Sequence, residues 1–119
     1  IAPSNPILSI KPILSIHPIG EILKKYKEKV CIVSPIIGGK AVKGPTIQIM
    51  KSMGLDSTSV GIARYYSGFS NMIVCDETDR DLEVEIKKFF PKVVFTSTLM
   101  KSLEDKIRLA DEVQNMSFQ

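Results

Sequence analysis

The segment VCIVSPIIGGKAVKGPT, residues 30–46, determines the fold class. It opens with an apolar run that does not alternate with polar residues, which is typical of a strand covered on both faces. Glycines follow, and then Gly44-Pro45 opens a helical pattern, since proline is common at the first position of a helix. A strand, a glycine-rich connection and a helix indicate a parallel sheet with helices packed against it.

The rest of the chain repeats this alternation of strands and helices. Together with Val30–Ser34, apolar runs at Ile1-Ala2, Met72–Cys75 and Val93–Thr96 predict strands. Helical patterns are expected at Ile19–Lys27, Pro45–Met53, Ser57–Tyr66, Leu82–Phe90 and Leu103–Val113. Their inward stripes would include Ile22, Met53, Val84, Leu103 and Ile107. We therefore expect an α/β fold, a Rossmann-like and mostly parallel sheet with flanking helices, over residues 1–119 as a single unit.

The opening segment, SNPILSIKPILSIHPIG at residues 4–20, contains Pro-Ile-Leu-Ser-Ile twice. Prolines at positions 6, 12 and 18 argue against a regular helix, because each lacks an N–H and disfavours helix in the preceding residue. Its isoleucines and leucines argue against a solvated linker. We interpret Ser4-Asn5-Pro6 as part of a turn, either ligand-facing or ordinary, and the remainder, including His17, as a support that leads to the helix at Ile19.

Composition limits the classes of partner. The 119 residues carry a net charge of +3, and no basic run is longer than Lys24-Lys25, which disfavours a nucleic-acid partner. No stretch is apolar enough to span a membrane and none resembles a signal peptide, so we expect a cytoplasmic protein without a membrane partner. Cys31 and Cys75 stand inside apolar runs without metal-binding spacing, and buried reduced thiols are expected there.

Ligands of open α/β sheets bind beyond the carboxyl ends of the strands, so the loops at those ends hold the candidate site. The first loop offers short polar groups for a ligand edge, or forms an ordinary turn. The second offers glycine backbone and lysines for a phosphate or an acidic ligand, or is a connection with solvated lysines. The candidate substrate-binding residues are Ser4, Asn5, Pro6, Gly38, Gly39, Lys40, Lys43 and Gly44.

Other polar residues have weaker functional interpretations. Asp76 follows a strand and could hold Mg²⁺, or it could cap the next helix as we expect of Asp79–Asp81. Ser102 and Asp105 form a plausible capping pair for the last helix. Arg64 could clamp a phosphate or lie at the surface. No catalytic residue and no metal ligand can be assigned from these patterns.

Three segments together resemble a known family. They are APSNPILSIKPIL (residues 2–14), VSPIIGGKAVKGP (33–45) and ARYYSGFSNMIVCDETDRDLEVEIKKFFPKVVFTSTLM (63–100). The chain, from Ile1 to about Val113, is similar to the carboxyl-terminal half of the 2-phospho-L-lactate transferases, the CofD family. We therefore expect it to be the carboxyl-terminal part of a larger transferase domain.

The resemblance implies transfer of a phospholactyl or phosphoenolpyruvyl group from a guanosine-diphosphate-linked donor to the deazaflavin Fo. GMP is released, and the product is an intermediate of coenzyme F-420 in methanogens and some other microbes. Mg²⁺ is the implied cofactor, a homodimer the implied assembly of the full-length enzyme, and the fold is Rossmann-like. Ser4 and Asn5 match the family's Ser-Asn-Pro and would face the guanosine diphosphate. Lys40 and Lys43, with the glycine backbone, would neutralise phosphates.

The family's amino-terminal half, with its glycine-rich nucleotide loop and metal-binding aspartates, has no counterpart in this sequence. We therefore expect the isolated chain to lack transferase activity, with the Mg²⁺ ligands outside it. Two alternatives stay open. One is a regulatory module of the same fold that binds a nucleotide or nucleotide-sugar without transferase chemistry. The other is an α/β fragment whose amphipathic helices dock onto a partner chain.

Overall fold

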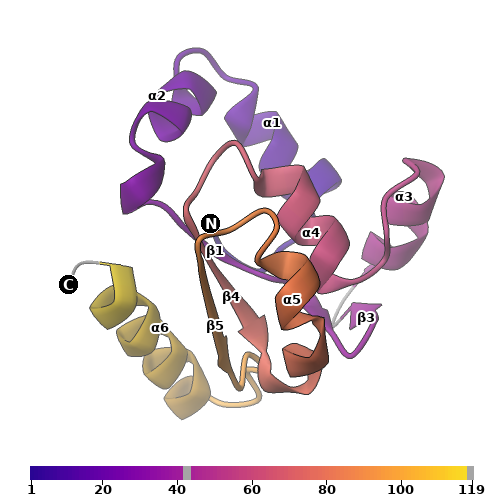
Figure 1. The fold of residues 1–119 in the computed structure, drawn as a ribbon, viewed down its shortest axis with the longest axis vertical. Helices are drawn as coiled ribbons and strands as arrows, with labels where there is room; N and C mark the ends of the chain where they lie inside the picture. The colour runs from indigo at the N-terminus through magenta and orange to yellow at the C-terminus, as the bar shows by residue number, and fades with distance from the viewer. Residues whose placement is uncertain (42–43, 118–119) are drawn as a thin grey trace.

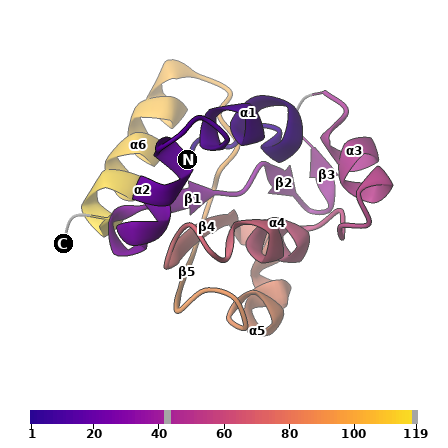
Figure 2. The same cartoon turned by 90° about the horizontal axis from the view of Figure 1, so that it is seen from above.

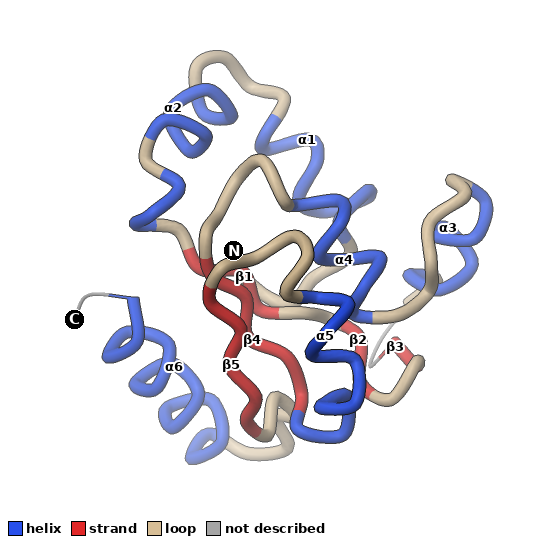
Figure 3. The backbone as a smooth tube through the Cα atoms, in the orientation of Figure 1, coloured by secondary structure: helices blue, strands red, loops and turns tan. Residues whose placement is uncertain are grey.

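Three parallel strands form the centre of the molecule, which is described here as a computed structural model covering residues 1–41 and 44–117. The strands are β1 (Cys31–Val33), β4 (Met72–Asp76) and β5 (Lys92–Thr96), in the order β1-β4-β5 (Figures 1 and 3). Cys31 pairs with Met72, which pairs in turn with Lys92, so the three strands start in line. The predicted α/β class with a parallel sheet is confirmed.

The first residue extends this sheet at the edge of β1. The amino group of Ile1 donates to the Cys31 carbonyl, and the Val33 N–H donates to the Ile1 carbonyl at 3.0 Å. These two bonds, one to each side of Ile32, are the pattern of a parallel pair. The expected strand at Ile1-Ala2 is therefore represented by one residue in parallel pairing, and the chain leaves this edge toward Pro3 and Ser4.

Helices cover both faces of the sheet, as Figure 2 shows from above. Helix α4 (Ser59–Tyr66) and helix α5 (Glu83–Ile86) pack on one face, where Ile32, Ile73 and Cys75 are fully buried. Helix α6 (Leu103–Ser117) covers the other face through Leu109. Because successive strand residues point to opposite faces, burial on both faces explains why the strands read as continuous apolar runs.

The opening segment is helical, which contradicts our expectation from its prolines. It forms a π-helix, η1 (Pro6–Ile10), followed by α1 (Lys11–Leu14). Pro6 stands in the first turn of η1, and Pro12 in the first turn of α1, where a missing N–H leaves no hydrogen bond unmade. The Lys11 N–H reaches back five residues to the Pro6 carbonyl, so the wide turn ends directly before Pro12.

Shorter elements connect the rest of the chain. Helix α2 (Ile19–Lys25) and the 3₁₀ helix η2 (Lys27–Lys29) lead into β1, and the 3₁₀ helix η3 (Glu77–Leu82) joins β4 to α5. Strands β2 (Ile36–Ile37) and β3 (Lys40–Ala41) form an antiparallel hairpin where we expected an irregular loop. Helix α3 (Thr46–Ser52) follows, and Gly54, two residues after its end, has a φ of +71°.

Several side chains predicted to point inward are exposed. The exposed fractions are 52% for Met53, 73% for Val84, 66% for Leu103 and 52% for Ile107, and Ile22 is similar. In α6 the buried stripe runs instead through Leu109, with Val113 and Met116 partly buried beside it. None of the helices in the described part of the chain combines the length and apolar character that crossing a bilayer requires.

Candidate functional site

A cavity of about 460 Å³ lies at the carboxyl ends of the strands, where the fold predicts a ligand site. Three of the four loops that follow the predicted strands contribute to it. Its polar lining includes Ser4 and Asn5 after the first strand residue, Ser34 after β1, Thr46 at the start of α3, and Thr98 after β5. Short hydroxyl and amide groups from distant parts of the sequence therefore face one space.

The sequence-predicted site residues divide into two groups. Ser4, Asn5 and Gly44 line the cavity, and Pro6 is buried behind it at the start of η1. Gly38, Gly39 and Lys40 belong to the β2–β3 hairpin, outside the lining. Gly38 and Gly39 have φ values of +58° and +75°, so they are needed for the tight turn itself. Lys43 lies outside the described residues. Ligand contact by any of these residues stays a prediction.

Asn5 lines the cavity and carries a buried hydrogen-bond donor. Its Oδ1 accepts from the Ile7 and Leu8 N–H groups, both at 3.0 Å, and this fixes the orientation of the side chain. Its Nδ2 is buried and has no hydrogen-bond partner among the described residues. A buried donor without a partner costs about 1–3 kcal/mol, so the amide is suited to donate to a ligand acceptor.

A buried polar chain fixes the hairpin beside the cavity. The Ile36 N–H donates to the Ser34 hydroxyl at 3.3 Å, and the Ser34 and Ser59 hydroxyl oxygens are 2.9 Å apart. The Ser59 hydroxyl donates to Asp79 Oδ2 at 3.1 Å, and the Gly38 N–H donates to Asp79 Oδ1 at 3.1 Å. Burial raises the pKa of Asp79 in spite of these bonds. Asp79 therefore holds the hairpin turn, a role that sequence reasoning missed.

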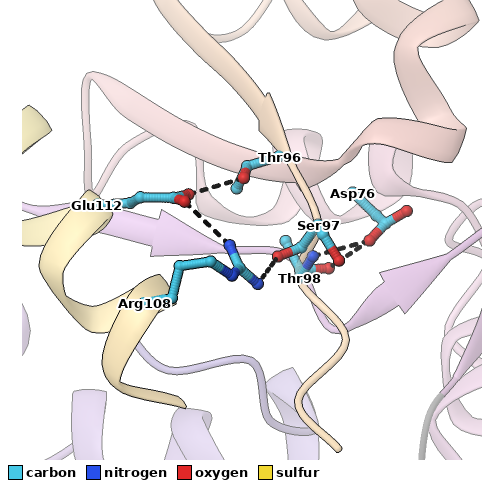
Figure 4. A network of polar contacts seen from close by, with 6 residues as sticks. All are labelled: Asp76, Thr96, Ser97, Thr98, Arg108 and Glu112. Carbon is cyan, nitrogen blue, oxygen red and sulfur yellow. Dashed lines mark hydrogen bonds and ion pairs between the residues drawn. The ribbon is translucent and has the colours of Figure 1, made fainter. Parts of the chain in front are cut away.

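Asp76 joins the end of β4 to the segment after β5. Its Oδ2 accepts from the Thr98 N–H at 2.8 Å and the Thr98 hydroxyl at 3.1 Å (Figure 4). Its Oδ1 accepts from the Thr78 N–H at 3.0 Å and hydroxyl at 2.9 Å, which caps η3. Burial acts to raise the pKa of Asp76, but the four bonds outweigh it and the pKa is lowered. The carboxylate thus places Thr98 in the cavity.

The described residues do not fit a Mg²⁺ site. No three His, Cys, Asp or Glu side chains among residues 1–41 and 44–117 gather closely enough to hold a metal ion. The cavity lining, as far as it is described, contains no carboxylate. Asp76, the best candidate from sequence, uses both oxygens to accept hydrogen bonds. Hard cations require oxygen ligands that are free to coordinate, and these are not present here.

Two sets of contacts fix α6 against the sheet. Glu112 accepts from the Thr96 hydroxyl at 2.7 Å and from Arg108 Nη1 at 3.0 Å, and Arg108 Nη2 donates to the Ser97 carbonyl at 2.7 Å (Figure 4). At the start of the helix, the Ser102 hydroxyl accepts from the Asp105 N–H, and Asp105 Oδ2 accepts from the Ser102 N–H, both at 3.2 Å. The predicted capping pair is confirmed.

His17 and Arg64 lie away from the cavity, and three of its lining residues were not selected from the sequence. His17 is exposed and lies 3.5 Å from Glu21 Oε1, and Arg64 lies over the Phe89 ring at 5.7 Å, so neither reaches the cavity. Sequence reasoning did not select Thr46, Thr98 or Lys106, which line it. For Lys106 the sequence contained one indication: none of its helix neighbours three and four residues away is acidic, so no ion pair within the helix neutralises its charge.

Comparison with known proteins gives one consistent result. A family model described as "2-phospho-L-lactate transferase CofD" matches residues 1–110. Relatives named 2-phospho-L-lactate transferase include one from Methanocaldococcus jannaschii, 44% identical over 95% of this chain and 35% of its own length. Another, from Methanococcoides burtonii, is 47% identical over 87% of this chain and 33% of its own length. The chain therefore spans about a third of the curated relatives it matches.

Proposed function

Because the chain belongs to the CofD family of 2-phospho-L-lactate transferases, we propose that it forms part of the substrate site of such an enzyme. The observation that carries this proposal is the cavity at the strand ends, with Asn5 in its wall and no partner for the buried Asn5 amide among the described residues. A site lined by amide, hydroxyl and ammonium donors suits a nucleotide, whose base and phosphates offer many acceptors.

The proposed reaction moves a phospholactyl group, or its enolpyruvyl analogue, from a guanosine-diphosphate-linked donor to Fo. The acceptor hydroxyl forms a new O–P bond with the phosphorus that carries the lactyl group. The bond to the bridging diphosphate oxygen breaks, GMP leaves, and the hydroxyl proton is released. Phosphoryl transfer of this kind depends mainly on positioning and charge stabilisation.

The part assigned to this chain is binding and orientation. Asn5 and Ser4 contact the guanosine diphosphate, and Thr46 adds a hydroxyl donor at the cavity wall. The Thr98 hydroxyl donates its proton to Asp76, so toward a ligand it acts as an acceptor. Mg²⁺, which the family resemblance implies, would be held by residues beyond those of this chain. The isolated chain is then inactive as a transferase, and the complete enzyme is a homodimer.

The substitution Asn5→Asp tests the nucleotide site. It keeps an oxygen for the Ile7 and Leu8 N–H groups, so the cap is maintained, but it removes the Nδ2 donor. We expect isothermal titration calorimetry to show GDP binding by the unmodified chain and affinity weaker by about tenfold or more in N5D. Asn71→Asp adds the same charge outside the lining and is the control. Equal GDP affinity in N5D and the unmodified chain would contradict the proposal.

Two further measurements separate the alternatives. Preferential binding of a UDP-sugar over GDP would favour the regulatory module. A chimera in which this chain replaces the matching third of the Methanocaldococcus jannaschii relative tests activity directly. We expect the chimera, but not the isolated chain, to transfer the phospholactyl group to Fo in a chromatographic assay. Transfer by the isolated chain would show that the remaining two thirds are unnecessary.

A further inference from the structure

Lys106 is the one charged side chain in the described lining of the cavity. It stands in the second turn of α6, far in sequence from Ser4, Asn5 and Ser34 on the other walls. An unopposed ammonium group among hydroxyl and amide groups attracts an anion, and no carboxylate in the described lining competes for it.

The ammonium group has no partner within the protein, as far as residues 1–41 and 44–117 show. Other lysines of the chain do: Lys87 Nζ lies 2.6 Å from Glu83 Oε1, and Lys88 Nζ lies 2.8 Å from Glu85 Oε2. The helix neighbours of Lys106 at three and four residues' distance are Ser102, Leu103, Leu109 and Ala110. None of these can pair with it, so its charge remains available to a ligand.

The helix fixes the backbone at Lys106, and the lysine side chain itself is exposed. Helix α6 is tied to the end of β5 by Arg108 and Glu112, and its start is fixed by the capping pair of Ser102 and Asp105. Lys106 also borders a second, apolar hollow of about 270 Å³ under α6. Placing an ammonium group between apolar walls costs free energy, so Lys106 is more favourably directed toward the polar cavity than toward this hollow.

We propose that Lys106 binds phosphate oxygens of the ligand in the cavity, as the cationic contact that the sequence patterns had placed on Lys40 and Lys43. This inference rests on the proposed nucleotide site for the identity of its ligand. Charge-assisted hydrogen bonds from lysine to phosphate are about twice as strong as neutral ones, so one such contact contributes measurably to affinity.

The test is calorimetric titration of the 119-residue chain with GDP, guanosine and inorganic phosphate. We expect Lys106→Met to weaken GDP binding about tenfold while guanosine affinity stays unchanged. Lys106→Arg, which keeps the charge, should restore much of the GDP affinity. Lys101→Met removes an exposed lysine just before the same helix, outside the lining, and is the matched control. Added salt should weaken GDP binding more in the unmodified chain than in K106M.

The outcomes distinguish this inference from the proposed function. GDP binding that is equal in K106M and the unmodified chain overturns the role of Lys106 and leaves the nucleotide site standing. Absence of GDP binding, with inorganic phosphate bound in a Lys106-dependent way, overturns the nucleotide site and supports the lysine. Equal loss of guanosine and GDP in K106M, or binding of neither GDP nor phosphate by the unmodified chain, overturns the inference.

Discussion

Removal of the Asp76 carboxylate should destabilise the fold and distort the cavity at the same time. Asp76→Ala deletes the acceptor of four hydrogen bonds between 2.8 and 3.1 Å, two from Thr78 and two from Thr98. The two residues that donate these bonds, Thr78 and Thr98, differ in their exposure to water. Thr78 is exposed, so water can replace its bonds, whereas Thr98 is only 4% exposed and its N–H would be left without a partner.

The loss of unfolding free energy in D76A follows from this difference in exposure. A buried N–H without an acceptor costs about 1–3 kcal/mol, and loss of the remaining, water-accessible bonds adds about 1 kcal/mol, giving about 2–4 kcal/mol in total. This corresponds to a fall in Tm of roughly 10 °C for a domain of this size. Glu77→Ala removes an exposed carboxylate from the next position and should change Tm by about 1 °C at most.

The assay is thermal and urea unfolding followed by circular dichroism, repeated at several pH values. The four bonds lower the native pKa of Asp76 despite its burial, so its contribution is complete above the ordinary aspartate pKa of about 4. It is lost as pH falls through the lower native pKa, and the difference between D76A and the unmodified chain should narrow there. Equal unfolding free energies for D76A and E77A at neutral pH would refute this reasoning.

Two further changes test neighbouring contacts. Asp79→Asn should leave the unfolding free energy at neutral pH unchanged or about 1 kcal/mol higher, because burial raises the pKa of Asp79 and the ionised form is disfavoured in the native state. For the same reason, the unfolding free energy of the unmodified chain should fall as pH rises through that raised pKa, and urea unfolding of D79N should not show this fall. A loss of more than about 2 kcal/mol of unfolding free energy in D79N at neutral pH would contradict this reasoning. Ser102→Ala removes one half of the capping pair and should cost about 1 kcal/mol, with faster amide hydrogen exchange in the first turn of α6; unchanged exchange there would show that the cap is dispensable.

The three strands of the parallel sheet could be predicted because each is marked by its own local sequence. Each buried strand is a short apolar run, and burial on both faces leaves no polar residue to break it. The opening segment was predicted wrongly because the prolines were judged one by one. Their effect depends on their place in a helix, and both Pro6 and Pro12 stand in first turns.

The orientation of α6 could not be predicted, because its sequence contains two apolar stripes. Leu103 and Ile107 lie on one, and Leu109, Val113 and Met116 on the other, each at helical spacing. Only packing against Val33 and Val74 on the sheet selects the second stripe. Once Leu109 faces the sheet, Lys106 comes to the cavity, so the same choice that exposes Leu103 brings a cation to the site. The hydrogen bond between the Gly38 N–H and Asp79 could not be predicted from the sequence either, since 41 positions separate the two residues.

The division between structural and ligand-facing groups supports a binding role for this chain. Both buried carboxylates near the cavity, Asp76 and Asp79, accept hydrogen bonds through each of their oxygens. To coordinate a metal ion through either oxygen, Asp76 would have to give up hydrogen bonds from Thr78 or from Thr98. Among the described lining residues, the groups left to donate include the Asn5 amide, the Ser4 and Thr46 hydroxyls and the Lys106 ammonium. Donors of this kind hold and orient an anionic ligand, and in the proposed transferase the groups that activate the reaction would come from the rest of the enzyme.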